Sequence, residues 1–187
     1  PPRPVPDNLI WGIDLTGKTD SAGMLHCILG IVEHHSRAAL MLGVVKDKAS
    51  ITLLECLLAV VKKHGKPTFI RTDNEAVFTS RLFRFGLWML GIRHQRTEIA
   101  CPWQNGKVER FFGTLKQKLN QWEVASAGEL IHSLHLFRFW YNHVRPHDYL
   151  DGATPAELWS GSKGNPNRAK WFEAWDGLLT GYWLPPP

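Results

Sequence analysis

The order of the apolar segments is the feature that most constrains how this chain can fold. Three short apolar runs come first, at residues 9–16 (LIWGIDLT), 24–32 (MLHCILGIV) and 38–45 (AALMLGVV). Short β-rich runs joined by tight polar turns are typical of an antiparallel meander. The beginning of the chain therefore predicts three antiparallel strands, the first of which ends at Gly17.

The pattern then changes to an alternation of helix and strand. Apolar residues recur at helical spacing from Ser50 to His64, and Gly65 follows as a stop signal. The remaining segments predict strands at 68–72 and 92–97, a loop at 98–106, and helices at about 79–90, 107–122 and 127–144. Three antiparallel strands followed by this alternation predict an α/β fold, a mixed five-stranded sheet flanked by helices.

Length and composition fit one globular domain with a full hydrophobic core. The 187 residues are 44% hydrophobic and 21% charged, and no apolar run approaches the roughly 20 residues that span a bilayer. We expect a proline-rich linker at 1–8, a core at 9–160 and a Trp- and Pro-rich tail at 161–187. The tail is expected to dock on the core rather than stack on bases. A net charge of +5 is compatible with a polyanionic partner, but it is weak evidence alone.

The three cysteines predict neither a disulfide framework nor a metal site. Cys27, Cys56 and Cys101 are widely spaced and form no C-x-x-C pair. A zinc site that uses Cys27 with its neighbouring histidines, His26, His34 and His35, lacks the usual ligand spacing. We interpret Cys27 and Cys56 as small buried hydrophobic residues.

Three carboxylates carry the functional hypothesis. Asp14 lies inside an apolar strand, Asp73 follows the strand at 68–72, and Glu109 lies in a predicted helix. Each has an ordinary alternative role. Asp14 could cap a turn or pair with Lys18, Asp73 could form an Asx-turn or a helix N-cap, and Glu109 could lie on a solvated helix face. Together, adjacent strands and a helix crossing their edge can bring the three acids to one place. Such a set of oxygen ligands suits Mg²⁺ or Mn²⁺.

The helix around Glu109 gives a further clue. Asn105, Gly113 and Lys116 lie on the same face as Glu109, away from the apolar stripe of the helix. Cations on this helix are suited to meet phosphates; they are Lys107, Arg110, Lys116 and Lys118. The alternative is an ordinary charged outer face, which would be preferred if the acids were absent.

These residues resemble the DDE superfamily of retroviral-type integrases and bacterial insertion-sequence transposases. Asp73 and Glu109 are separated by the 35 residues 74–108, which matches the D,D-35-E spacing of that family. Three segments resemble the bacterial version of its core: PWQNGKVERFFGTLKQKL (102–119), YNHVRPH (141–147) and TPAEL (154–158). The similarity extends over roughly residues 9–160.

The resemblance implies a ribonuclease H-like fold and metal-dependent DNA cleavage and strand transfer. It implies that Asp14, Asp73 and Glu109 are the catalytic metal ligands, for Mg²⁺ or Mn²⁺, with two ions when DNA is bound. It places a set of residues near the DNA: Asn105, Gly106, Lys107, Arg110 and Lys116. It also implies a homodimer or larger assembly and a cytoplasmic, nucleoid-associated bacterial protein with no membrane association.

The sequence departs from the family pattern in two respects. After Asp73 and Asn74 the family often has a glycine, whereas this chain has Glu75, which becomes an alternative acidic ligand. The part that would recognise element ends lies outside this sequence. Two other functions stay open: a ribonuclease H-type nuclease, and a DNA-binding or assembly module whose chemistry has decayed. We interpret the polar cluster His143, Arg145 and His147 as structural.

Overall fold

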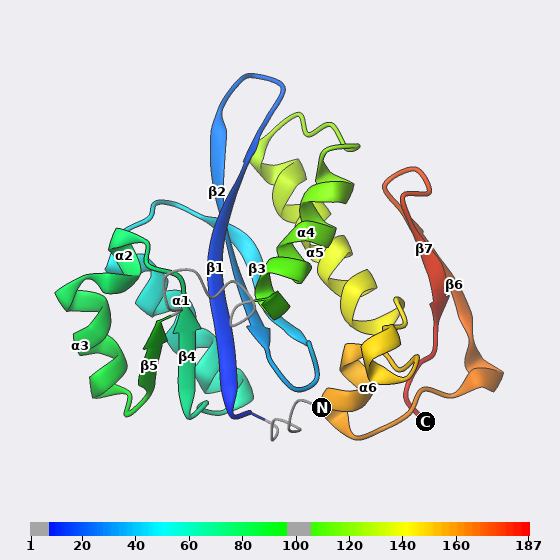
Figure 1. The fold of residues 1–187 in the computed structure, drawn as a ribbon. Helices are drawn as coiled ribbons and strands as arrows, with labels where there is room; N and C mark the ends of the chain where they lie inside the picture. Colours follow the sequence, from blue (N-terminus) through cyan, green and yellow to red (C-terminus); the bar gives the residue numbers. More distant parts are fainter. Residues whose placement is uncertain (1–7, 97–105) are drawn as a thin grey trace.

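A five-stranded mixed sheet forms the centre of the computed structural model, which describes residues 8–96 and 106–187 (Figure 1). Its strand order is β3-β2-β1-β4-β5. The strands are β1 (Ile10–Thr19), β2 (Leu25–Glu33), β3 (Ala39–Val45), β4 (Phe69–Thr72) and β5 (Arg93–Arg96). The first three pair antiparallel, and β4 is parallel to both β1 and β5. The predicted mixed sheet is confirmed.

Helices and a terminal hairpin surround this sheet. The helices are α1 (Ser50–His64), α2 (Ala76–Thr79), α3 (Arg81–Met89), α4 (Gly106–Leu119), α5 (Ala127–His143) and α6 (Pro155–Ser160), with the 3-10 turns η2 (Asp148–Leu150) and η3 (Pro166–Arg168). Strands β6 (Lys170–Ala174) and β7 (Leu179–Trp183) form a separate antiparallel hairpin. No helix in the described ranges is long and apolar enough to cross a membrane.

The two faces of the sheet bury different cores. Side chains alternate along a strand, so the odd residues of β1 face one side and the even residues face the other. Trp11 and Ile13 belong to the core that includes residues of α1 and α3, whereas Ile28 of β2 belongs to the core formed with α4 and α5. Asp14 is an even residue and therefore lies on the α4 side.

Two glycines let helix α4 approach the sheet closely. A Cβ at Gly12 would clash with the side chain of Val108 and lie 2.8 Å from His34 Nε2, and one at Gly30 would lie 2.5 Å from Phe112 Cζ. Gly30 is paired directly with Asp14 across β1 and β2. The absence of side chains at these two positions therefore sets the docking of α4 beside Asp14.

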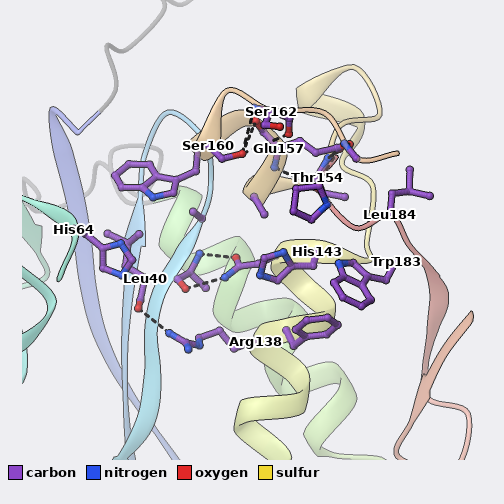
Figure 2. A pocket seen from close by; sticks show the side chains of 18 of the residues that line it. Leu40, His64, Arg138, His143, Thr154, Glu157, Ser160, Ser162, Trp183 and Leu184 are labelled. Carbon is purple, nitrogen blue, oxygen red and sulfur yellow. Dashed lines mark hydrogen bonds between the residues drawn. The ribbon is translucent and has the colours of Figure 1, made fainter. Parts of the chain in front are cut away.

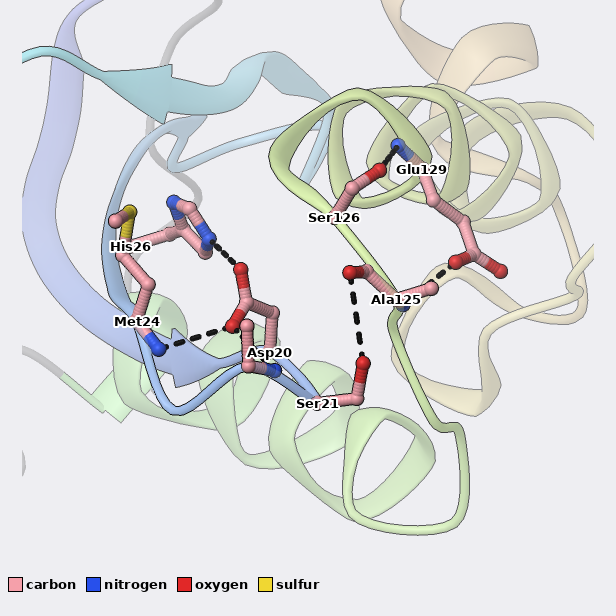
Figure 3. A network of polar contacts seen from close by, with 8 residues as sticks. Asp20, Ser21, Met24, His26, Ala125, Ser126 and Glu129 are labelled. Atoms are coloured by element: carbon pink, nitrogen blue, oxygen red, sulfur yellow. Dashed lines mark hydrogen bonds and ion pairs between the residues drawn. The ribbon is translucent and has the colours of Figure 1, made fainter.

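Three element ends differ from the sequence prediction. Strand β1 continues past Gly17, because its pairing with β2 extends to Thr19 opposite Leu25. The tip of this hairpin is fixed by Asp20, whose carboxylate lies 2.8 Å from His26 Nε2 (Figure 3). The helix expected at about 79–90 is α3, which begins at Arg81 because Ser80 accepts the Phe83 N–H as the N-cap. The short helix α2 before it was not expected. Helix α4 ends at Leu119 rather than near Trp122.

The terminal hairpin lies against α5 (Figure 1). Trp175, at its turn, is 3% exposed and stacks on Trp122 with ring centroids 5.6 Å apart. Trp140 of α5 donates its indole N–H to the Thr180 carbonyl at 2.9 Å. The indole of Trp175 thus belongs to the core, while Trp171 is exposed. The division into linker, core and tail stays a prediction.

Candidate active site

The parallel register of β1 and β4 brings Asp14 and Asp73 together. Ile10 pairs with Phe69, and Gly12 pairs with Arg71. The same offset, continued for two residues, sets Asp14 opposite Asp73 just beyond the end of β4. The Asp73 carboxylate acts electrostatically on Asp14 and raises its pKa, as expected for neighbouring acids.

Asp14 carries a perturbed carboxyl group. Burial raises the pKa of Asp14 to about 6, and repulsion from Asp73 and Glu75 adds to this effect. The Leu15 N–H, which donates to Asp14 Oδ1 at 2.8 Å, and Lys116 act in the opposite direction on the pKa. A divalent cation would neutralise the repulsion between these acids, so the donors present fit a hard metal ion.

The simple alternatives for the two aspartates have different outcomes. Lys18 does not pair with Asp14; its ammonium group donates to the Leu119 carbonyl at 2.6 Å. Asp73 does form an Asx-type turn, because its carboxylate accepts the Glu75 N–H at 2.9 Å. The turn leaves the second carboxylate oxygen of Asp73 for another partner, so it is compatible with metal binding.

Glu109 lies on the helix that crosses this face of the sheet. It is exposed in the first turn of α4, next to Val108, which packs on Gly12. Within residues 8–96 and 106–187, no three His, Cys, Asp or Glu side chains lie close enough together to hold one metal ion. The β1–β4 offset makes Asp14 and Asp73 neighbours, whereas Glu109 on α4 does not complete a three-ligand group with them.

The residues expected near DNA have different environments. Lys107 is half-buried and donates to the His34 carbonyl at 2.7 Å. Arg110 is exposed and lies 4.9 Å from the centre of the Tyr149 ring. Lys116 is exposed, and its positive charge lowers the pKa of Asp14. Gly106 begins α4 with open space where a Cβ would be, and Asn105 lies outside the described residues.

The sequence predicted the turn at Ser36 and Arg37, but it did not single out Glu33, which is buried in this turn beside the site. Glu33 is fully buried at the end of β2, and its carboxylate accepts the N–H groups of His35 at 2.9 Å and Ser36 at 2.6 Å. Arg37 follows with φ 65°, an uncommon backbone conformation for a residue with a Cβ. A glutamate at the end of an otherwise apolar run, LHCILGIVE, was the available signal.

His34 of this turn is packed between β1 and α4. Burial lowers its pKa to about 3, and the charges of Arg71, Lys107 and Arg37 contribute. Its Nε2 is buried and has no hydrogen-bond partner among the described residues. The ring is therefore neutral at physiological pH.

A larger cavity lies elsewhere, between α5, α6 and the C-terminal segment (Figure 2). It has a volume of about 570 Å³, and none of the three predicted acids lines it. Arg138 donates to the Leu40 carbonyl at 2.9 Å and Asn142 donates to the Ala39 carbonyl at 3.0 Å, so its polar wall ties α5 to β3. His143 also lines this cavity and lies against Phe139.

Several known proteins are similar to this chain in sequence. Residues 90–155 match the family described as integrase core domain. An uncharacterised Caenorhabditis elegans protein, K02A2.6, is 31% identical over 146 residues, which cover 77% of this chain and 11% of that protein. An uncharacterised 39.2 kDa protein of insertion element IS476 from Xanthomonas euvesicatoria is 28% identical over 153 residues, covering 81% of this chain and 44% of that protein. The chain thus spans less than half the length of both relatives.

Among solved structures, the magnesium complex of the HTLV-2 integrase catalytic core domain, described as a trimeric form, is similar to this fold. Its TM-score is 0.64 at 23% identity, and the match covers 83% of this chain and 99% of that one. The fold is that of a ribonuclease H-like integrase catalytic core. Residues 90–155 thus match the integrase core family, and the chain as a whole is similar in sequence to an insertion-element protein and in fold to a retroviral integrase core.

Proposed function

We propose that this chain catalyses metal-dependent cleavage and strand transfer of DNA, with Asp14, Asp73 and Glu109 as its metal ligands. One observation carries the proposal: the β1–β4 register sets Asp14 beside Asp73 on the sheet face that α4 covers. The match to the integrase core family supports DNA transposition or integration as the process. The position of Glu109 in the first turn of α4, one residue from the contact with Gly12, supports its assignment.

Each acid would have a defined part in the reaction. Asp14 and Asp73 would hold Mg²⁺ or Mn²⁺ from the sheet, and Glu109 would hold it from α4. Two such ions, when bound, activate the attacking oxygen and stabilise the leaving oxygen of an in-line phosphoryl displacement. Lys116 would limit the negative charge around Asp14. Water or a DNA 3′ hydroxyl attacks the phosphodiester directly, so no protein side chain forms a covalent intermediate.

DNA strand transfer also requires that two DNA ends be held together. We therefore expect a homodimer or a larger assembly on DNA. Of the residues proposed to lie near DNA, Arg110 and Lys116 are exposed. Gly106 and Lys107 lie in the same first turn of α4 as Glu109, and Asn105 directly precedes Gly106 in the sequence.

A branched DNA that mimics a strand-transfer product tests the proposal, because its resolution does not depend on recognition of element ends. We expect Mg²⁺- or Mn²⁺-dependent breakage and rejoining by the wild type and a loss of at least about 100-fold in Glu109→Gln. Glu55→Gln is the matched control, since Glu55 is also an exposed helical glutamate, on α1. Its activity should equal that of the wild type.

Titration with Mn²⁺ separates the remaining functions. Binding of Mn²⁺ that is weakened in Asp14→Asn supports the metal site. Failure to bind Mn²⁺, together with failure to resolve the branched DNA, would contradict the enzyme and leave a DNA-binding or assembly module. Cleavage of an RNA–DNA hybrid without joining of DNA would instead indicate a ribonuclease H-type nuclease.

A further inference from the structure

A small cavity on the flank of α4 gathers cationic side chains from separate parts of the chain. It has a volume of about 140 Å³. Its cations are Arg37 from the β2–β3 turn, Lys107 and Arg110 from α4, and Arg145 from the segment after α5. Asp148 is the one carboxylate among its lining residues. Four cations against one acid make this cavity strongly positive.

Charge compensation from the protein is partial, because the buried Glu33 carboxylate acts on both Arg37 and Lys107. Among the described residues, the guanidinium groups of Arg37, Arg110 and Arg145 form no ion pair. Arg37 and Arg110 instead lie against the ring of Tyr149, at 5.4 and 4.9 Å from its centre. Arg145 lies against the rings of two residues of α5. Grouping like charges without partners is unfavourable unless an anion joins them.

Contacts within the protein hold the cationic side chains of this cavity in place. The buried carboxylate of Glu33 fixes the turn that carries Arg37, whose left-handed backbone is rare for a residue with a side chain. The Lys107 ammonium group ties the same turn to α4 through the His34 carbonyl. Two elements distant in sequence are thus held so that their cations meet at one place.

Tyr141 forms the inner wall. The residue is 4% exposed, and its pKa is raised to about 12 by burial, against the effect of the nearby charges of Arg145, Arg37 and Arg110. Its hydroxyl therefore stays protonated and can donate to an anion. Lys107 also has its pKa lowered, to about 8, by burial and by Arg37, although the nearby Glu33 carboxylate acts in the opposite direction.

The volume of the cavity limits the size of the anion that it can hold. A volume of about 140 Å³ is well below the roughly 300–1,000 Å³ of cavities that enclose drug-sized ligands. It accommodates a phosphate group but not a nucleotide. Arginine guanidinium groups bind phosphate oxygens in a bidentate manner, and three of them converge here.

We propose that this cavity binds one backbone phosphate of DNA, with Arg37, Arg145 and the Tyr141 hydroxyl as its ligands and Arg110 at its rim. The inference rests on the proposed function and deepens it. Helix α4 carries both Glu109 and Arg110, on neighbouring positions, so a phosphate held here would position the strand relative to the acids. Phosphate contacts of this kind set register and do not read sequence.

The test measures binding of a fluorescent DNA duplex by anisotropy across a salt series in the absence of divalent metal. Each phosphate contact contributes about 0.9 to the slope of log K against log salt. Arg37→Gln with Arg145→Gln should weaken binding and lower the slope by about 1. Tyr141→Phe should weaken binding without changing the slope, because it removes a donor and no charge.

The matched control is Arg81→Gln with Arg84→Gln, which removes the same charge from α3, on the opposite face of the sheet. It should leave the slope within error of the wild type. An equal fall of slope in both double variants would refute a specific site. Should Arg145→Gln unfold, Arg145→Lys and the single Arg37→Gln replace it, with thermal unfolding as the check on folding.

Inorganic phosphate distinguishes the two sources of the anion. Competition with DNA only at high millimolar phosphate, in the wild type and not in the double variant, supports a backbone phosphate as the ligand. Tight binding of free phosphate with an unchanged DNA slope would overturn the proposal in favour of a small-anion site. Resolution of branched DNA with an unchanged slope in Arg37→Gln/Arg145→Gln would refute this cavity alone, whereas no DNA binding by the wild type would refute both proposals.

Discussion

An alanine at position 12 is expected to push helix α4 away from strand β1. The added methyl group would meet the side chain of Val108, which is fully buried, and would lie 2.8 Å from His34 Nε2. Gly12 has an ordinary strand conformation, so the substitution adds no backbone strain. Overpacking a close-packed contact of this kind costs about 1–3 kcal/mol. Since α4 carries Glu109 one residue beyond Val108, resolution of branched DNA should fall as well.

A second substitution tests whether the Val108 contact is the cause. Val108→Ala alone removes two buried methyl groups and should cost about 2 kcal/mol. In Gly12→Ala/Val108→Ala the new methyl group occupies part of the space that Val108 vacates. The double variant should therefore be destabilised by about 2 kcal/mol rather than by the sum of about 4, which is a coupling of about 2 kcal/mol.

The assay is urea unfolding followed by tryptophan fluorescence, with the free energy of unfolding obtained by linear extrapolation. Some residual cost in the double variant is expected, because the contact with His34 remains. Costs that add to within about 0.5 kcal/mol would show that the two positions do not contact each other, and the close docking of α4 on β1 would be refuted.

Three further stability predictions follow. Gly113→Ala should raise the free energy of unfolding by about 0.5–1 kcal/mol, because Gly113 lies inside α4 with open space around its missing Cβ; a loss would mean that the space is filled. Trp175→Ala should cost about 3–5 kcal/mol, since the indole is buried in the core, and a cost below about 1 kcal/mol in urea unfolding would show that the hairpin is not docked. His34 has its pKa lowered to about 3 in the fold, so below pH 6.5 the unfolded chain takes up a proton that the native chain refuses. The free energy of unfolding should therefore decrease as the pH is lowered, and between pH 8 and pH 5 it should decrease by about 2 kcal/mol more in the wild type than in His34→Gln. Equal losses in both proteins would contradict a buried neutral ring.

The elements that the sequence predicted best are those whose own periodicity decides them. Helix α1 runs from Ser50 to His64 as expected, because an apolar stripe and a stop at Gly65 specify it locally. Helix α2 was missed because it is only four residues long. The start of α3 was predicted two residues early, because only the Phe83 N–H that Ser80 accepts identifies Ser80 as its N-cap. The terminal hairpin was missed because its strands of five residues include exposed aromatic side chains and lack a clean alternation.

Part of the candidate site could likewise be predicted from the sequence, and part could not. Asp14 and Asp73 could be paired from the sequence, since acids at corresponding positions of two parallel strands must be neighbours if the register is right. The phosphate cavity could not be predicted, because Arg37 and Arg145 are more than 100 residues apart and meet only through tertiary packing. Their residue types carry no signal of that meeting, so the sequence favoured the structural interpretation of Arg145.

Helix α4 contributes residues to both proposed sites. Variants that move α4 should therefore affect both sites, whereas variants of the cavity residues should affect only one. With 3.6 residues per turn, Val108 and Phe112 face the sheet, Glu109 and Lys116 lie on one flank, and Lys107 lies with Arg110 on the other. A displacement of α4 by Gly12→Ala should therefore impair catalysis and phosphate binding together. Arg37→Gln with Arg145→Gln should lower the salt dependence of DNA binding while leaving the affinity for Mn²⁺ unchanged. If that variant lost Mn²⁺ as well, the cations would act by positioning α4, and the direct contact with phosphate would be refuted.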